Sequence, residues 1–344
     1  MLQGGAVDAV IIIYKMKIGI PRALLYYEFF PLWKTFFETL DTGIEIVVSN
    51  PTTKKTIEKG SKYTIDEACL PFKVHRGHVI ELRDKVDYIF IPRIASSKKS
   101  EYMCAKFLGL PDTIKNTVPG LAKKIIDTNF DANSVSLKKS FYELGKRIAP
   151  KSKNIKLAYK KALEAQKNFN RAAQKIQDPE NITRLLENKP LKEKPLHPYT
   201  VALIGHPYNL YDSYVNMNII KKLEAQKFSV VTPDMLPEEI TNKEVREISE
   251  GIYWTLSKRI MGACGYYAKQ DYINGIVFFL SFPCGPESLT ESITRIKLEN
   301  KLKGKAPPMM TLIIDALTAD AGLETRIEAF TEMIIDKNQG GGKN

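Results

Sequence analysis

The sequence contains little cysteine, histidine or tryptophan: its 344 residues include 4 Cys, 4 His and 2 Trp. Four cysteines are too few for the disulfide framework of a small secreted scaffold, so we expect reduced thiols. The longest apolar run, at residues 9–14, is far shorter than the roughly 20 residues of a membrane-spanning helix. It also lacks the basic segment and cleavage site of a signal peptide. These absences predict a soluble, cytoplasmic protein without a membrane partner.

The usual nucleotide-binding and hydrolase motifs are also missing. No G-x-x-x-x-G-K-[ST] occurs, and neither Gly19 nor Gly205 begins a G-x-G-x-x-G after its expected strand. The sequence has no H-E-x-x-H and no G-x-S-x-G. We therefore disfavour an ATPase, a dinucleotide-dependent oxidoreductase and the common hydrolases.

Positive charge is present but confined to one segment. The chain carries a net charge of +12. Residues 146–194 contain 14 basic and 5 acidic side chains, which leaves only +3 for the rest of the chain. Because the positive charge is confined to one segment, the sequence disfavours nucleic acid as a partner. Two readings of the segment remain open: a solvated helix face, or a docking surface for an acidic partner.

The order of predicted elements indicates an α/β fold. Residues 17–21, 24–40 and 44–48 read as strand, helix and strand, and residues 201–207, 214–227 and 228–231 repeat the pattern. Each half has a further strand of continuous apolar type, at 86–92 and at 273–280. Because β-α-β units form parallel sheets, we expect two α/β domains with parallel sheets.

The expected domain boundaries follow from composition. Residues 1–15 read as a leader or upstream start, 16–140 as the first α/β domain, and 199–336 as the second. Residues 141–198 between them form a basic helical connector and linker, in which 141–186 is helical with a break at 178–180. Residues 337–344 are expected to form a disordered tail.

Three cysteines stand at positions where chemistry is expected. Cys69 precedes a predicted helix at 72–83, while Cys104 and Cys284 follow predicted strands, one in each domain. In open α/β sheets ligands bind beyond the carboxyl ends of the strands, so two facing edges would bring the three thiols together. Thiolates select soft metals, which makes zinc or an iron–sulfur cluster the candidates. Buried free cysteines acting as small hydrophobes are the alternative.

Other residues are weaker candidates. His75 and His78 stand three apart on the same predicted helix, a spacing that could clamp a metal, although two ordinary helical histidines explain it better. A structural zinc site of Cys69, His75 and Cys104 is one hypothesis. Cys264 lies between small residues, where close helix packing explains it as well as ligation does, so it is a reserve ligand only.

Several motifs resemble a known family. The strings at 18–24 (IGIPRAL), 66–71 (DEACLP, with Lys73 following) and 104–112 (CAKFLGLPD) are similar to the activase-related domain of the 2-hydroxyacyl-CoA dehydratase system. The strings at 275–277, 282–287 (FPCGPE) and 325–333 (TRIEAFTEM) resemble the dehydratase and benzoyl-CoA reductase subunits. The resemblance extends over about residues 16–335.

This resemblance implies two Rossmann-like domains with a [4Fe-4S] cluster in the cleft between them. The family's ligand positions correspond to Cys69, Cys104 and Cys284. Members receive an electron from a separate ATP-dependent activase, and the dehydratases use it on an acyl-CoA. Arg93 would supply a positive charge near the cluster or form a salt bridge to Glu101. Lys73 and His75 are further candidates for positions around the cluster, although ordinary surface residues explain them better.

The resulting hypothesis is an anaerobic iron–sulfur electron-transfer or reductase component. Its partners would be the activase and a small-molecule or acyl-CoA substrate, with a homodimer as one possible assembly. Whether the protein catalyses a reaction or only relays electrons stays open. The rival hypotheses are a module that binds RNA or an acidic protein through residues 146–194, and the structural zinc protein.

Overall fold

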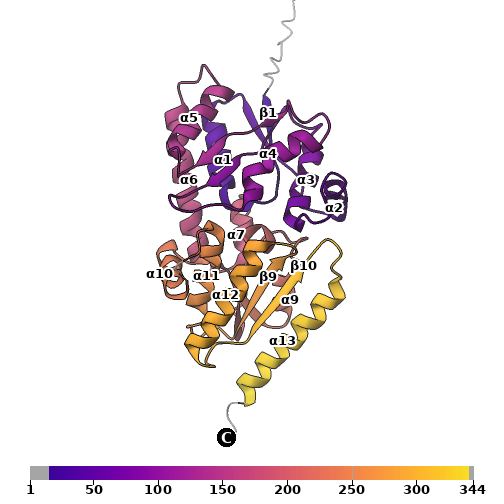
Figure 1. Cartoon of the computed structure of the whole chain (residues 1–344), viewed down its shortest axis with the longest axis vertical. Helices are drawn as coiled ribbons and strands as arrows, with labels where there is room; N and C mark the ends of the chain where they lie inside the picture. Colours follow the sequence, from indigo (N-terminus) through magenta and orange to yellow (C-terminus); the bar gives the residue numbers. More distant parts are fainter. Residues whose placement is uncertain (1–14, 250, 341–344) are drawn as a thin grey trace, which may run out of the picture.

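A computed structural model describes residues 15–249 and 251–340, so nearly all of the predicted leader lies outside the described residues. The described chain is an α/β protein with 13 α-helices and three sheets, in which every strand pair is parallel. Figure 1 shows the two larger sheets and their helices one above the other along the long axis. No helix in these two ranges is long and apolar enough to span a membrane.

The first sheet has the strand order β2-β1-β3-β5. Its strands are β1 (Met16–Ile20), β2 (Ile44–Val48), β3 (Tyr88–Phe90) and β5 (Ile125–Ile126). The second sheet has the order β10-β9-β7-β8. Its strands are β7 (Tyr199–Ile204), β8 (Phe228–Val231), β9 (Gly275–Ser281) and β10 (Met309–Ile314). When the strands of each sheet are numbered in chain order, both sheets have the order 2-1-3-4. The strand–helix–strand pattern that repeats in the sequence therefore belongs to two sheets of the same topology.

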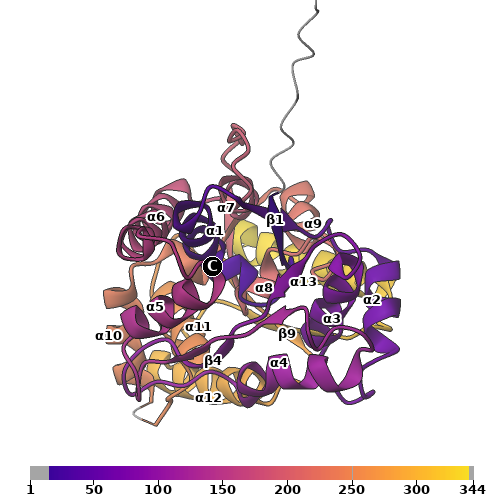
Figure 2. The same ribbon diagram turned by 90° about the horizontal axis from the view of Figure 1, so that it is seen from above.

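The remaining elements surround these sheets. A two-stranded sheet pairs β4 (Arg93–Ser96) with β6 (Asn129–Asp131). Figure 2 shows α1 and α6 together at the opposite side of the first sheet from α2 and α3. The helices are α1 (Tyr26–Leu40), α2 (Lys54–Ser61), α3 (Leu70–Leu82), α4 (Ala105–Thr117), α5 (Leu137–Ile148), α6 (Ile155–Ile176), α7 (Pro179–Leu186), α8 (Pro207–Leu210), α9 (Ile219–Ala225), the 3₁₀ turn η1 (Pro233–Met235), α10 (Glu238–Ile248), α11 (Thr255–Tyr267), α12 (Gly285–Leu302) and α13 (Asp320–Gly340).

The basic connector is three helices, which corrects the expectation of one helix interrupted at 178–180. The helix also breaks between α5 and α6, because α5 ends two residues before Pro150, which cannot continue a helix. The buried face of α6 carries Ala158 and Ala162, whose small side chains allow close packing against the first half. Lysines on the opposite face are exposed, as expected of a solvated basic helix face: Lys156, Lys160, Lys161 and Lys167.

Two predicted boundaries also differ from those in the structure. The predicted helix at 214–227 is only α9, because Met217 and Asn218 adopt left-handed backbone angles that a helix cannot include. At the other end, α13 continues to Gly340, beyond the boundary expected at 336. Residues 341–344 of the predicted tail lie outside the described residues.

Buried polar contacts join the two halves of the chain, the one that contains the first sheet and the one that contains the second. Thr52, before α2, donates its hydroxyl proton to the carboxylate of Asp212, after α8. Since that hydroxyl is used as a donor, Nε2–H of His78 donates to Thr52 Oγ1 over 2.9 Å. The ring of His78 is fully buried, and burial lowers its pKa to about 3, with Arg22 acting in the same direction. Glu81 lies 3.9 Å from Nδ1 and opposes this shift only weakly.

This shift predicts acid sensitivity. His78 is neutral in the folded protein down to about pH 3 but takes up a proton near pH 6.5 when unfolded, so its contribution to stability is complete above pH 6.5 and is lost as the pH falls toward 3. Each pH unit in this window removes about 1.4 kcal/mol. Urea unfolding of His78→Gln should show a shallower decline below pH 6, whereas His197→Gln should keep the parent slope. An unchanged slope in His78→Gln would contradict the assignment.

Helices α2 and α3 approach each other at two glycines. A Cβ built on Gly77 of α3 would lie 1.9 Å from the carbonyl oxygen of Thr56, and one on Gly60 of α2 would lie 1.8 Å from that of Lys73. No side chain fits at such a backbone contact. The contact holds α3, and therefore the cysteine that precedes it, against α2.

We expect Gly77→Ala to destabilise the protein by about 1–3 kcal/mol, because the two helices must separate. Gly109→Ala in α4 is the matched control, since its added methyl group meets nothing within 4 Å. This control should gain up to about 1 kcal/mol from the better helix propensity of alanine. Thermal or urea unfolding of both variants measures the difference, and equal stabilities would contradict the packing argument.

Candidate functional site

Each of the three cysteines immediately precedes an α-helix. Cys69 is the N-cap of α3, Cys104 of α4 and Cys284 of α12. Proline in the first turn, Pro71 in α3 and Pro286 in α12, is typical of a helix start. The unpaired N–H groups and the positive end of the helix dipole favour negative charge at these positions. The helix N-termini therefore favour negative charge at all three sulfurs, and burial opposes this effect at Cys69 and Cys284.

The three cysteines line one cavity of about 100 Å³. Leu24 follows β1, His206 follows β7 and Cys284 follows β9, and all three residues reach it. In sheets of order 2-1-3-4, the connections that leave strands 1 and 3 diverge and open a crevice at the carboxyl edge. The cavity is thus lined by residues that follow strands of both larger sheets.

A lysine accompanies Cys69. Nζ of Lys106, two residues into α4, donates to Sγ of Cys69 over 3.5 Å, and Lys106 also lines the cavity. Burial raises the pKa of the Cys69 thiol, while Lys106 and the backbone N–H of Phe72 lower it. Burial is the larger effect, so the thiol without a bound cation is protonated.

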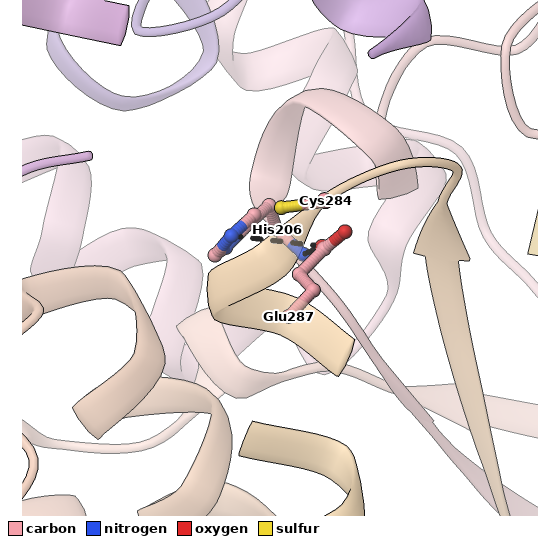
Figure 3. Close-up of side chains that lie close together, drawn as sticks. All are labelled: His206, Cys284 and Glu287. Atoms are coloured by element: carbon pink, nitrogen blue, oxygen red, sulfur yellow. Dashed lines mark hydrogen bonds and ion pairs between the residues drawn. The ribbon is translucent and has the colours of Figure 1, made fainter. Parts of the chain in front are cut away.

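Cys284 lies beside a buried acid and a buried imidazole. Cys284, Glu287 and His206 each bring a potential ligand atom within 4.8 Å of the other two (Figure 3). The carboxylate of Glu287 accepts hydrogen bonds from the backbone N–H groups of Ser281 and His206 and from Nδ2 of Asn209. Its oxygens are thus already occupied. Glu287 anchors the loops after β7 and β9 to each other and fixes the position of Cys284.

Burial dominates the electrostatics of this cluster. Burial raises the pKa of Glu287 to about 7, although its hydrogen-bond donors act in the opposite direction. Burial lowers the pKa of His206 to about 3, with a smaller contribution from Arg259, so the ring is neutral. The pKa of the Cys284 thiol is raised, first by burial and then by Glu287, with Cys69 and Cys104 contributing. Mutual repulsion of this kind reflects three sulfurs at one place.

Two buried polar atoms at the cavity have no protein partner. Nδ1 of His206 and Oγ of Ser257 are both inaccessible and without a hydrogen bond, and both residues line the cavity. An unsatisfied buried polar group costs about 1–3 kcal/mol, so such groups usually face an ion, a water or a ligand. The cavity therefore has the features of a binding site with hydrogen-bonding capacity.

One family model matches a large part of the chain. Residues 17–236 match the family described as CoA enzyme activase uncharacterised domain, which is more than half of the chain. The chain belongs to this family. The matched region includes Cys69 and Cys104, and Cys284 lies beyond it.

Other comparisons add little. No curated protein matches the chain. Among solved structures, the C-terminal domain of glucosamine-fructose-6-phosphate aminotransferase from Francisella tularensis is similar over 93% of this chain and 84% of that one, at 11% identity and a TM-score of 0.20. A likeness of this size carries no argument about fold or function.

The other residues predicted for the site lie away from the cavity lining. Arg93 forms a two-pronged ion pair with Asp112 at 2.6 and 2.7 Å, and Glu101 pairs with Lys258 instead. Nζ of Lys73 donates to the backbone oxygen of Asp66. The cation that does reach the cavity is Lys106.

Two more candidates are buried elsewhere. His75 lies inside α3, where burial lowers its pKa to about 3, and it does not line the cavity. Cys264 is fully buried in α11. Its neighbour Gly262 approaches the backbone of α10 so closely that a Cβ would lie 2.1 Å from the oxygen of Thr241. Close helix packing accounts for this small-residue segment, as the sequence suggested.

Sequence reasoning did not assign three residues of the site: Lys106, His206 and Ser257. The sequence does indicate a role for Lys106, because it stands two residues after Cys104 at a helix start, where its side chain can turn back to the site. The sequence also indicates His206, because it is the second residue after β7, at the carboxyl end of that strand. No sequence pattern indicates Ser257, because only tertiary packing brings α11 to the cavity.

Lys106→Met should raise the pKa of Cys69 further and slow its alkylation by iodoacetamide at pH 8 roughly threefold in the reduced, metal-free protein. Peptide mass spectrometry measures the rate for each cysteine. Lys73→Met is the matched control, because its ammonium group is held by Asp66, and it should leave the rate unchanged. Equal slowing in both variants would indicate a general change in surface charge instead.

Proposed function

We propose that this chain is an iron–sulfur protein that holds a [4Fe-4S] cluster through the thiolates of Cys69, Cys104 and Cys284. One observation carries the proposal: three cysteines from three helix N-termini line a single cavity at the carboxyl edges of both sheets. When bound, the cluster would supply one-electron chemistry. The surrounding residues bind it, neutralise its charge and limit its contact with water.

The spacing of the sulfurs favours a cluster over a single ion. Around one zinc ion with bonds of about 2.3 Å, tetrahedral ligands lie roughly 4 Å apart. Within residues 15–249 and 251–340, the only triad whose potential ligand atoms lie within 4.8 Å of one another is His206, Cys284 and Glu287. The three sulfurs together do not meet that limit. Three cysteines that line one cavity without approaching this closely suit a body of several atoms better than a single ion.

The donor set and its surroundings also fit. Lys106 and the helix N-termini offset negative charge, and the N–H groups of Phe72 and Glu287 favour the thiolates of Cys69 and Cys284. The unpaired Nδ1 of His206 and Oγ of Ser257 can hydrogen-bond to a polar occupant. Three cysteines leave one iron of such a cluster without a thiolate, so a small molecule can bind there.

A separate activase is the proposed electron donor. The family description links the chain to CoA enzyme activases. Large apolar side chains stand exposed near the cysteines in sequence, which is typical of a surface that docks another protein. They are Tyr102 at 49%, Leu108 at 46%, Phe282 at 59% and Leu289 at 47% exposure. An electron donor seated on them would be close to the cavity.

The alternatives have less support. The zinc hypothesis needs His75 beside Cys69 and Cys104, but His75 does not line their cavity. A binding module has one observation in its favour, the exposed lysines of α6, which lie on a different surface from the cysteines. It predicts salt-sensitive binding to an acidic partner and leaves the convergence of the three cysteines unexplained.

The test is anaerobic reconstitution with iron and sulfide, followed by metal and sulfide analysis, absorption and electron paramagnetic resonance spectroscopy after dithionite reduction. We expect about four irons and four sulfides per chain and a reducible cluster. Cys284→Ser should lose most of the bound iron, whereas Cys264→Ser, in the α11 core, should retain it.

Stoichiometric zinc, or a colourless protein after reconstitution, would overturn the proposal. Equal iron loss in both serine variants would show that the ligands are misassigned. Circular dichroism and urea unfolding of both variants separate these results from simple misfolding.

A further inference from the structure

A second and larger cavity adjoins the cysteine cavity. Its volume is about 280 Å³, and Met103 and Leu256 line both cavities. These two side chains therefore form a shared wall. The cysteine site described above does not use this second cavity.

Apolar side chains make up most of its surface, and many are aromatic. They come from several elements, and include Phe29, Leu32 and Trp33 of α1, Phe141 of α5, and Leu163 and Phe169 of α6. An apolar cavity of about 150 Å³ holds benzene, and sites for drug-sized ligands begin near 300 Å³. The size therefore fits one aromatic ring with a short substituent. It is too small for a whole acyl-CoA.

The charged residues of the lining define which substituent fits. Three cations and four carboxylates reach the cavity, so the lining carries one excess negative charge. Every cation is already paired, which leaves none to bind a ligand carboxylate. The pairs are Lys98 with Glu238 at 2.6 Å, Lys258 with Glu101 at 3.1 Å, and Arg259 with Glu28 at 2.6 Å and Asp234 at 3.0 Å.

An independent observation also points to a ligand. Oγ1 of Thr255 is buried and has no hydrogen-bond partner, and Thr255 lines this cavity. A hydroxyl group in this state can accept a hydrogen bond from a ligand. Its neighbours Leu256 and Lys258 line the same cavity, so the start of α11 presents both polar and apolar contacts.

We propose that this cavity binds a small, single-ring aromatic molecule that carries an amine or a hydroxyl group and no carboxylate. The ring packs against the aromatic wall, and the substituent donates to Thr255 or to the carboxylates around Arg259. The site goes beyond the proposed function, because its lining contains none of the cysteines and its formation does not require a cluster.

Three probes of nearly equal size test the charge preference: 2-phenylethylamine, 2-phenylethanol and phenylacetate. Each is titrated into the full chain by calorimetry and by ligand-observed nuclear magnetic resonance. We expect the amine and the alcohol to bind, and the acid to bind at least about tenfold more weakly, since the cavity offers it no unpaired cation. Equal binding of the acid, or no binding of any probe, overturns the proposal.

Matched variants locate the binding. Leu163→Trp on α6 fills the cavity and should weaken amine and alcohol binding at least about tenfold. Leu157→Trp is the control, because the same change on the same helix falls at an exposed position outside the cavity. Equal effects of both changes would place the probes elsewhere and refute the site.

Asp234→Asn provides a test that does not depend on cavity filling. It balances the cations and carboxylates, so the amine should bind more weakly than to the parent protein while alcohol binding stays the same, and unchanged amine binding contradicts the charge argument. The variant with Cys69, Cys104 and Cys284 all replaced by serine should still bind the amine. Loss of iron without loss of amine binding separates this site from the cluster proposal, and loss of both would show that this cavity is not independent.

Discussion

The convergence of three helix N-termini on one cavity is the constraint from which the chemistry of this protein follows. Each terminus acts roughly as half a positive charge, and Lys106 adds a full one. Burial alone would keep the thiols of Cys69 and Cys284 protonated, because it raises the pKa of each. The cavity therefore favours anionic sulfur only when a cation is shared among the thiolates. The arrangement suits a metal cluster better than three independent reactive cysteines.

Topology creates this convergence. Both sheets have the order 2-1-3-4, and each opens a crevice where the connections from its first and third strands diverge. In the second sheet these connections carry His206 and Cys284, and Glu287 holds them together by accepting hydrogen bonds from both loops. In the first sheet, the contact of Gly77 with the backbone of α2 holds α3 and therefore Cys69. Residues outside the cavity thus determine where its sulfurs lie.

Local patterns predicted much of this arrangement. Strands β2 and β8 have the bounds expected from their β-branched, apolar runs, and the three cysteines adjoin predicted elements at the edges where ligands bind. Tertiary features were not accessible in the same way. The helix expected at 214–227 is shortened by left-handed angles at Met217 and Asn218, which no periodicity reveals. Ser257 reaches the cavity only through packing of the halves. Arg93 was the expected cation, but it is paired with Asp112, a contact that sequence spacing does not reveal.

The wall that Met103 and Leu256 form between the two cavities lies at the junction of the two halves of the chain. Met103, which lines both cavities, directly precedes Cys104, and Leu256, which also lines both, directly precedes Ser257. These segments are hydrogen-bonded to each other: Tyr102 N–H donates to the oxygen of Tyr253 at 2.8 Å, and Thr255 N–H donates to that of Tyr102 at 3.0 Å. Because one segment comes from each half, separation of the halves would break the shared wall and open both cavities together. A partner that docks on exposed Tyr102 would therefore contact the backbone that separates the cysteines from the second cavity.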